Sequence, residues 1–417
     1  MTQPAELPAA EIRGALTRSA AVYMILFSAV GCWSAYASVL FKELGVGLAV
    51  IGLLASVPAA VSIVGAPTWG LVADRLGDVR PPLLVAGLWA AAAASLLALQ
   101  PPMPWTALVV AVLAAGSSGL TPLVDARTVE RLGRARDRFG QARAFGSLGF
   151  ILTTLAVGML VQASGTVAML AVYVPALALT GIAGAALLGR GSRSTRASGI
   201  GPIRALRLLR DPGMGLFFAG SVVVWIAATG VMAFFSLRLI ELGGDARLVG
   251  IGWAANAVLE IPTMLAYRRL VGRLRVQWLL VAGAAIFVVR AALFAVTGSA
   301  IGLVVGAALG GVGFGLFLVG TTTFVARRAP ASLRATAQAL FSSTAFAIGS
   351  IVGGILAGLV AGEWGLAAVF PAAAVTSAVG ALMIWLAVIR RDVPVQAAEV
   401  APRATPTTAV ELPSPDR

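Results

Sequence analysis

The stretch GLVADRLGDVR, residues 70–80, ends one long apolar segment and begins another. It contains four charged residues, whereas residues 47–69 before it and residues 81–100 after it contain none. A helix of roughly 20 apolar residues is long enough to span the ~30 Å hydrocarbon core of a bilayer. The stretch therefore predicts a short charged loop that joins two membrane-spanning helices.

The same alternation of apolar segment and charged loop runs along almost the whole chain. Hydrophobic residues make up 59% of the 417 residues and charged residues only 12%. The pattern predicts an all-α polytopic membrane protein, because only helices and closed barrels satisfy the backbone inside lipid. The expected spans are 20–41, 47–72, 81–100, 104–126, 142–162, 166–189, 214–237, 247–267, 277–297, 300–326, 335–361 and 366–389.

The arginines are concentrated in every second loop. The intervening loops hold only Lys42, Arg238 and Arg247 as basic residues. Basic loops stay on the cytoplasmic side of a membrane. The pattern thus predicts that both chain termini and all the arginine-rich loops are cytoplasmic. These loops carry Arg75, Arg80, Arg127, Arg131, Arg134, Arg136, Arg138, Arg190, Arg193, Arg196, Arg204, Arg207, Arg210, Arg268, Arg269, Arg273, Arg275, Arg327, Arg328 and Arg334.

The composition argues against several other classes of protein. A net charge of +14 could indicate nucleic-acid binding, but the basic residues are spread over loops between spans rather than gathered on one soluble surface. We attribute the charge to topology and to contact with anionic lipid headgroups. The single cysteine, Cys32, precludes an internal disulfide, and without histidine a Cys/His metal site is not available. We expect no metal, no cofactor and no cleavable signal peptide.

A long basic connector divides the chain into two halves of six expected spans each. It is rich in glycine and serine and therefore expected to be flexible. The halves resemble distant repeats, and we expect a monomer. The predicted organisation is a cytoplasmic segment 1–19, a six-helix bundle 20–189, a cytoplasmic loop 190–213, a second six-helix bundle 214–390 and a disordered cytoplasmic tail 391–417.

Residues 70–80 resemble the cytoplasmic signature of the major facilitator superfamily. The matching residues are Gly70, Asp74, Arg75, Gly77 and Arg80. The resemblance implies a major facilitator fold of twelve transmembrane helices in two pseudo-symmetric six-helix bundles. Gly70 would let helices approach closely, Gly77 would support a tight turn, and Asp74 would pair across the domain as a latch. A solvated turn that only sets topology is the alternative.

The segment FGQARAFGSLGF, residues 139–150, resembles the lactose-permease branch of that superfamily and its phenylpropionate-permease-like and nucleoside-symporter-like relatives. In that branch an acidic residue late in span four pairs with the arginine of span five, here Asp125 and Arg143. Arg143, Ser147 and Phe150 lie on one helix face, and an arginine fork suits vicinal hydroxyls or a carboxylate. Phe150 stands where the sugar permease has a tryptophan that stacks on the sugar. A structural ion pair between two helices is the alternative.

Isolated polar residues also mark the second half. Asn256, Glu260, Thr263 and Tyr267 form a stripe on span eight, and Arg290 lies in the middle of span nine. A charge at the bilayer centre costs about 2.5 kcal/mol or more, so Arg290 needs a partner, which we expect to be Glu260. The resemblance implies that the glutamate is a sugar ligand and the arginine a coupling residue. A buried structural pair is the alternative.

Span ten departs from the family pattern. Gly310 and Gly313 occupy the positions where the branch has a histidine and often an acidic residue that carries the proton. Glycines there favour close helix packing or bending. A proton is therefore one candidate for the coupling ion. Its carriers inside the membrane would be Glu260 and Asp125, and a facilitator or exchanger is the alternative.

We expect a secondary transporter of a sugar, glycoside, nucleoside or aromatic acid in a bacterial cytoplasmic membrane. It would work by alternating access around a central site. The partners would be a small solute and the lipid bilayer, with no nucleic acid. Efflux of drugs or metabolites is the alternative within transport. A non-transporting solute sensor and a membrane-embedded enzyme are alternatives of other classes, and the lack of histidine argues against the enzyme.

Overall fold

A computed structural model describes residues 9–190, 211–329 and 334–388. Within these ranges the chain forms helices and short connections, with no strand. Among the described residues, twelve helical segments are long and apolar enough to cross a membrane. The expected central loop falls mostly outside the described ranges, as does the expected tail.

The helices of the first half are α1 (Ala9–Glu43), α2 (Leu48–Leu76), α3 (Arg80–Ser95), α4 (Trp105–Ser117), α5 (Leu120–Leu132), α6 (Phe139–Ser164) and α7 (Leu170–Leu187). Those of the second half are α9 (Pro212–Glu241), α10 (Ala246–Val271), α11 (Val276–Val296), α12 (Ala300–Arg328), α13 (Arg334–Phe341), α14 (Gly349–Trp364) and α15 (Val369–Val388). Short 3-10 turns extend some of them: Leu96–Leu99, Gly133–Arg138, Thr166–Met169 and Leu366–Ala368. Together α4 and α5 form span four. Span eleven, Thr344–Trp364, consists of most of a π-helix Ser342–Ile348 and of α14, and α13 precedes it.

Several helices are longer than their apolar segments. The first helix begins at Ala9, not near residue 20, and α5 continues to Leu132, past the expected end at residue 126. Arginine, glutamate and leucine are good helix formers, so a helix that has left the hydrocarbon need not end there. The loops at the arginine-rich end are correspondingly shorter than expected.

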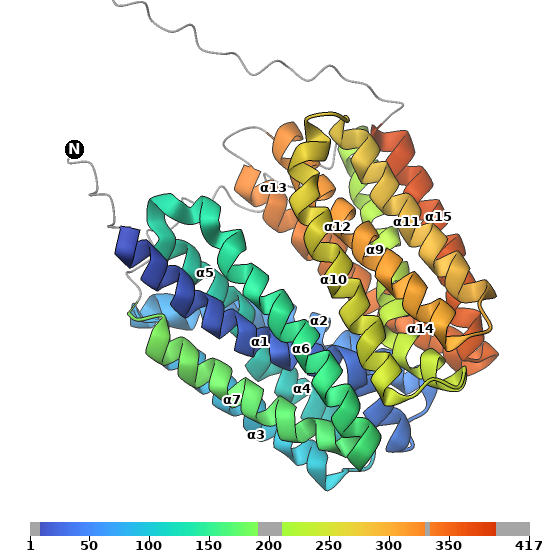
Figure 1. Ribbon diagram of the computed structural model, residues 1–417, viewed down its shortest axis with the longest axis horizontal. Helices are drawn as coiled ribbons and strands as arrows, with labels where there is room; N and C mark the ends of the chain where they lie inside the picture. Colours follow the sequence, from blue (N-terminus) through green and yellow to red (C-terminus); the bar gives the residue numbers. More distant parts are fainter. Residues whose placement is uncertain (1–8, 191–210, 330–333, 389–417) are drawn as a thin grey trace, which may run out of the picture.

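The helices form two bundles that lie side by side (Figure 1), one built from α1 to α7 and the other from α9 to α15. In the first, α1 packs on α6 and α7, and α3 packs on α4 and α7; in the second, α10 and α11 pack on α12, and α9 and α11 on α15. Within each half the helices meet through small residues. A Cβ at Gly87, for example, would lie 2.6 Å from Gly181 Cα. Small residues allow this because apolar helices in lipid associate by close packing.

The two halves meet at the end opposite the arginine-rich loops. There the Tyr36 hydroxyl of α1 lies 3.1 Å from the Ala246 carbonyl oxygen of α10, and Ser236 of α9 donates a 2.7 Å hydrogen bond to the Ala35 carbonyl. Toward the arginine-rich end the bundles diverge, and α5 and α12 lie apart (Figure 1). The space between the halves is thus sealed at one end only.

A glycine contact between α2 and α14 forms much of this seal. A Cβ at Gly52 would lie 2.4 Å from both the Gly354 carbonyl oxygen and Gly358 Cα. No real side chain tolerates backbone atoms that close. The two helices can therefore touch only because all three positions lack a side chain.

Candidate functional site

The first half places a carboxylate, a guanidinium and a phenol together. Nη1 of Arg143 on α6 lies 3.2 and 3.3 Å from the two carboxylate oxygens of Asp125 on α5. Tyr23 of α1 donates a 2.5 Å hydrogen bond to the same carboxylate, and the guanidinium lies over the Phe27 ring, 5.1 Å from its centre. The side chains of Arg143 and Asp125 are 43% and 34% exposed, so part of each stays available to a ligand.

Ser147 and Phe150 follow Arg143 on α6. Ser147 is half-buried and has no hydrogen bond to a described residue. The Phe150 ring packs on the Trp253 ring of the other half, with 6.2 Å between the ring centres. Trp253 in turn donates a 3.0 Å hydrogen bond to Ser236. Phe150 therefore lies at the floor of the space between the halves, against the sealed end.

The polar stripe of α10 is only partly available to a ligand. Asn256 donates a 3.0 Å hydrogen bond to the Ala307 carbonyl of α12, and Thr263 donates one of 2.7 Å to Leu259. Glu260 is half-buried, and its carboxylate has no hydrogen bond or ion pair with a described residue. It does interact electrostatically with Arg143, across the gap between the halves.

Arg290 does not pair with Glu260, so that expectation was wrong. Its side chain is 5% exposed and lies between the faces of Phe287 and Phe294, at 5.1 and 5.9 Å from the ring centres. Its Nε has no acceptor among the described residues. The missing side chain at Gly310 leaves room for the guanidinium against α12. Aromatic faces stabilise the cation in place of a carboxylate.

The glycines of span ten hold α12 against its neighbours. A Cβ at Gly310 would lie 2.7 Å from the Arg290 side chain, and one at Gly313 would lie 2.8 Å from Ile286. At Gly311 a Cβ would lie 2.0 Å from the Asn256 carbonyl oxygen. The departure from the family pattern therefore serves close packing, which sets the position of the helix that carries Glu260.

We expect Gly311→Ala to lower the thermal unfolding midpoint by several degrees, which corresponds to roughly 2 kcal/mol of overpacking. Gly310→Ala should cost less than Gly311→Ala, because its Cβ meets side-chain atoms of Arg290 and Asn256 rather than backbone, and alanine favours the helix. The measurement is the unfolding midpoint of both variants in the same detergent. Equal midpoints would show that the α10–α12 backbone contact is not a tight constraint.

The motif of residues 70–80 forms the turn between α2 and α3. Gly77 ends α2 with a φ of +62°, a left-handed conformation that favours glycine, as expected. Asp74 and Arg75 are exposed and pair with no described residue. Nothing lies within 4 Å of a Cβ at Gly70, so the close helix approach expected there is absent from this structure. The basic ends of the halves are apart, which removes the neighbour that Gly70 would meet.

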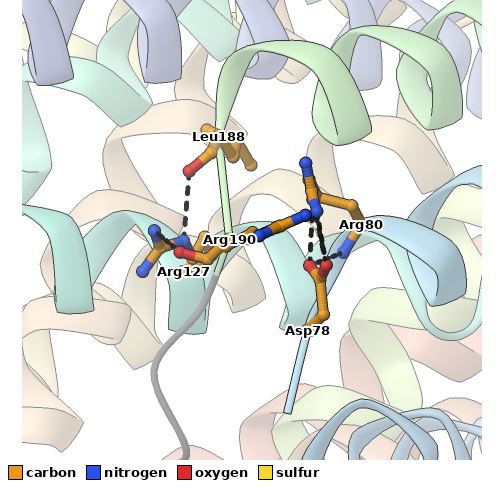
Figure 2. A network of polar contacts seen from close by, with 5 residues as sticks. All are labelled: Asp78, Arg80, Arg127, Leu188 and Arg190. Carbon is orange, nitrogen blue, oxygen red and sulfur yellow. Dashed lines mark hydrogen bonds and ion pairs between the residues drawn. The ribbon is translucent and has the colours of Figure 1, made fainter. Parts of the chain in front are cut away.

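Arg80 is held by Asp78 in the same turn. Arg80 Nε lies 3.1 and 3.0 Å from the two carboxylate oxygens, and Nη2 lies 2.8 Å from one of them (Figure 2). These charge-assisted hydrogen bonds hold the pKa of the Asp78 carboxyl below its usual value, and the positive charge of Arg190 acts in the same direction. The pair therefore stays ionised as pH falls to the normal carboxyl range.

Two arginines of α5 bind the end of α7, a role that topology alone did not reveal. Arg127 donates a 3.1 Å hydrogen bond to the Leu188 carbonyl and a second one to the Arg190 carbonyl (Figure 2). Arg131 donates one of 2.5 Å to the Leu187 carbonyl. The last carbonyls of a helix lack partners and carry partial negative charge. These arginines thus fix the basic ends of spans four and six to each other.

Comparison with known proteins agrees with this architecture. Residues 16–372 match the MFS_1 like family. The chain belongs to the MFS_1 like family. This family and the twelve-helix fold make the protein a membrane transporter of the major facilitator superfamily, a multi-pass membrane protein. No group of three or more His, Cys, Asp or Glu side chains that could hold a metal occurs in the described part of this transporter.

Relatives of this MFS_1 like protein include other transporters. The maltose permease of Geobacillus stearothermophilus is 28% identical over 367 residues, 87% of this chain and 92% of the permease. The uncharacterized transporter YwbF of Bacillus subtilis (strain 168) is 22% identical, over 72% of this chain and 74% of its own. The crystal structure of the nucleoside transporter NupG matches with a TM-score of 0.79 at 19% identity, covering 89% of this chain and 98% of that one. The NupG match shows a shared fold.

Proposed function

We propose that the protein is a secondary transporter that moves a small polar solute of the sugar or nucleoside class by alternating access. The observation that supports this proposal is that charged side chains from both halves lie close to one another. Arg143 of the first half, which is paired with Asp125, lies within electrostatic range of Glu260 of the second, in a space sealed at one end. The names of the relatives, a maltose permease and a nucleoside transporter, support this substrate class.

We propose that the arginine-rich end faces the cytoplasm, which places both chain termini there. Basic loops are retained on that side of a bacterial membrane. The described contacts between the halves then seal the extracellular end, and the structure corresponds to an inward-open state. Asp74, exposed in this state, would be the latch that engages when the basic ends close.

The proposed site recognises hydroxyl groups through complementary charges. The Arg143 guanidinium donates hydrogen bonds, and the free oxygen positions of Asp125 and Glu260 accept them from the solute. Ser147 offers a further hydroxyl, and Phe150 offers an apolar ring face at the floor. A solute bound to all of these would draw α6 and α10 together, which favours closure of the basic end. A proton is one candidate for the coupling ion. The chain has no histidine, so Glu260 and Asp125 are the side chains near the solute that would carry it.

We expect Glu260→Gln to abolish or weaken solute binding by about tenfold or more, since a hydrogen bond to a charged group contributes about 1.5–3 kcal/mol. The measurement is ligand-induced thermal stabilisation of the purified protein by maltose, other sugars and nucleosides, followed by counterflow in proteoliposomes for any that bind. Glu363→Gln, an exposed carboxylate at the sealed end, is the matched control. Equal stabilisation in the wild type and in Glu260→Gln would place the site elsewhere. A panel without any response would contradict the sugar or nucleoside class.

A further inference from the structure

A cavity inside the first half lies beside the proposed solute site, and none of the residues named for that site lines it. Its volume is about 180 Å³, and residues of α1, α2, α4, α5 and α7 line it. Its inner wall is aromatic: the rings of Trp33 and Tyr173 stack at 5.2 Å and 24°. Tyr173 is 5% exposed, whereas Trp33 and the hydroxyl-bearing Ser34, Ser117 and Thr121 are partly exposed, and we take the side with the three hydroxyls as the mouth.

The mouth of this cavity continues the helix faces that carry the charged cluster. On span four, Thr121 precedes Asp125 by one turn, and Ser117 precedes it by two. On α1, Val30 follows Tyr23 by two turns on the same face, and Tyr23 is hydrogen-bonded to Asp125. The two faces therefore run together from the Asp125 carboxylate to the cavity. A solute held at Asp125 by a polar group can reach into the cavity with the rest of its structure.

The size and lining of the cavity determine which chemical group of a solute can bind there. An apolar protein cavity of about 150 Å³ accommodates benzene. A cavity of about 180 Å³ with a stacked Trp33–Tyr173 wall suits one planar six-membered ring, which can pack against aromatic faces. It is too small for a second sugar of a disaccharide with its shell of hydroxyls, and its inner wall offers those hydroxyls few partners.

We propose that this cavity is a subsite for the aromatic or heteroaromatic ring of an amphipathic solute, such as an aryl glycoside or a nucleoside. The inference rests on the proposed function and narrows it. The polar part of the solute binds at Asp125 and Arg143, while the ring enters between α1, α4 and α7. Solutes that carry such a ring are then preferred over the same polar part alone.

The subsite can be tested without knowledge of the natural solute. In a Cys32→Ala chain, Ser117→Cys places a thiol in the cavity wall, and Ser95→Cys places an exposed reference thiol on α3. We expect the ratio of benzyl to ethyl methanethiosulfonate reactivity to be at least about tenfold higher at residue 117, and saturable, because binding of the ring precedes reaction. The reference thiol corrects for partition of the reagents into detergent. Equal ratios at the two positions would overturn the proposal.

A filling variant provides the second readout. Val30→Trp would block the mouth and should abolish the benzyl preference, whereas Val112→Trp should retain it. Val30 and Val112 are matched in exposure, at 36% and 37%, and Val112 does not line the cavity. A preference that survives Val30→Trp would overturn the proposal, since the ring would then bind outside the cavity.

Solute protection separates this proposal from the proposed function. 4-Nitrophenyl α-maltoside should slow the labelling of Ser117→Cys more than maltose does, or uridine more than ribose. A saturable benzyl preference without protection by any of the four would support the ring subsite and contradict the sugar or nucleoside class. Protection by maltose or ribose as strong as that by the ring-bearing partner would support the class and overturn the subsite.

Discussion

Gly52→Ser is expected to lower the transport rate by about tenfold or more, the effect of a shift of ~1.4 kcal/mol against the state sealed at this end. The added Cβ would lie 2.4 Å from backbone atoms of Gly354 and Gly358, which cannot rotate away. The helices α2 and α14 would have to separate, and the seal between the halves would open. A transporter that cannot close one end cannot complete its cycle, even with an intact solute site.

Two measurements check this result. Counterflow in proteoliposomes gives the transport rate. Spin labels on Met103→Cys and Gly298→Cys, in loops of the two halves at the sealed end, report the distance between the halves in a Cys32→Ala chain. We expect the distance distribution of Gly52→Ser to shift to longer values. Gly47→Ser is the matched control, because nothing lies within 4 Å of a Cβ at Gly47 and serine is a good residue at the start of a helix. Lost transport with an unchanged distance would show that the α2–α14 contact is not the gate.

Much of the fold could be predicted from the sequence because hydropathy acts on whole segments. Each expected span is present, since a run of apolar residues of that length has a large free-energy preference for lipid. The pairing of Asp125 with Arg143 was expected because the segment resembles a known permease branch, and the structure contains this ion pair. The resemblance to a known permease branch then restricted their geometry.

The rotational orientation of residues within the bundles was not accessible from hydropathy. The spacing places Arg290 on one face of span nine with Phe287 and Phe294, but hydropathy does not show whether that face meets Glu260 of span eight. Tyr23 was missed for the same reason, since one tyrosine in an apolar helix gives no sign that it binds a carboxylate. The helix contact expected at Gly70 depends on which conformation the transporter adopts. The sequence does not show which end of the transporter is open.

The contact that seals the floor was missed because it joins distant parts of the chain. Trp253 packs on Phe150 and donates a hydrogen bond to Ser236, but only Phe150 was singled out from the sequence, because Trp253 and Ser236 are ordinary in their own helices. A signal was present in the polar stripe of span eight, which continues toward Trp253 by one further turn from Asn256. Only the packing of α6 against α10 makes it part of the site.

Arg143→Gln is expected to reduce transport by up to about a hundredfold, because a hydrogen bond that involves a charged group contributes about 1.5–3 kcal/mol and glutamine carries no charge. Its cation is hydrogen-bonded to Asp125 and lies within electrostatic range of Glu260. Without it, the two acidic groups repel each other when the halves close. The variant should therefore bind solute weakly and also fail to close.

Three further variants separate charge from geometry. Arg143→Lys keeps the cation but loses the planar fork, so we expect about a tenfold loss of transport. Arg138→Gln is the matched control, because Arg138 is at the same end of α6 and its described contact is a hydrogen bond to Gln141. Asp125→Asn combined with Arg143→Gln restores neutrality at the pair and should recover the unfolding midpoint without recovering transport. If the double variant transported at the wild-type rate, Asp125 and Arg143 would be a structural pair, and the solute would have to bind elsewhere between the halves.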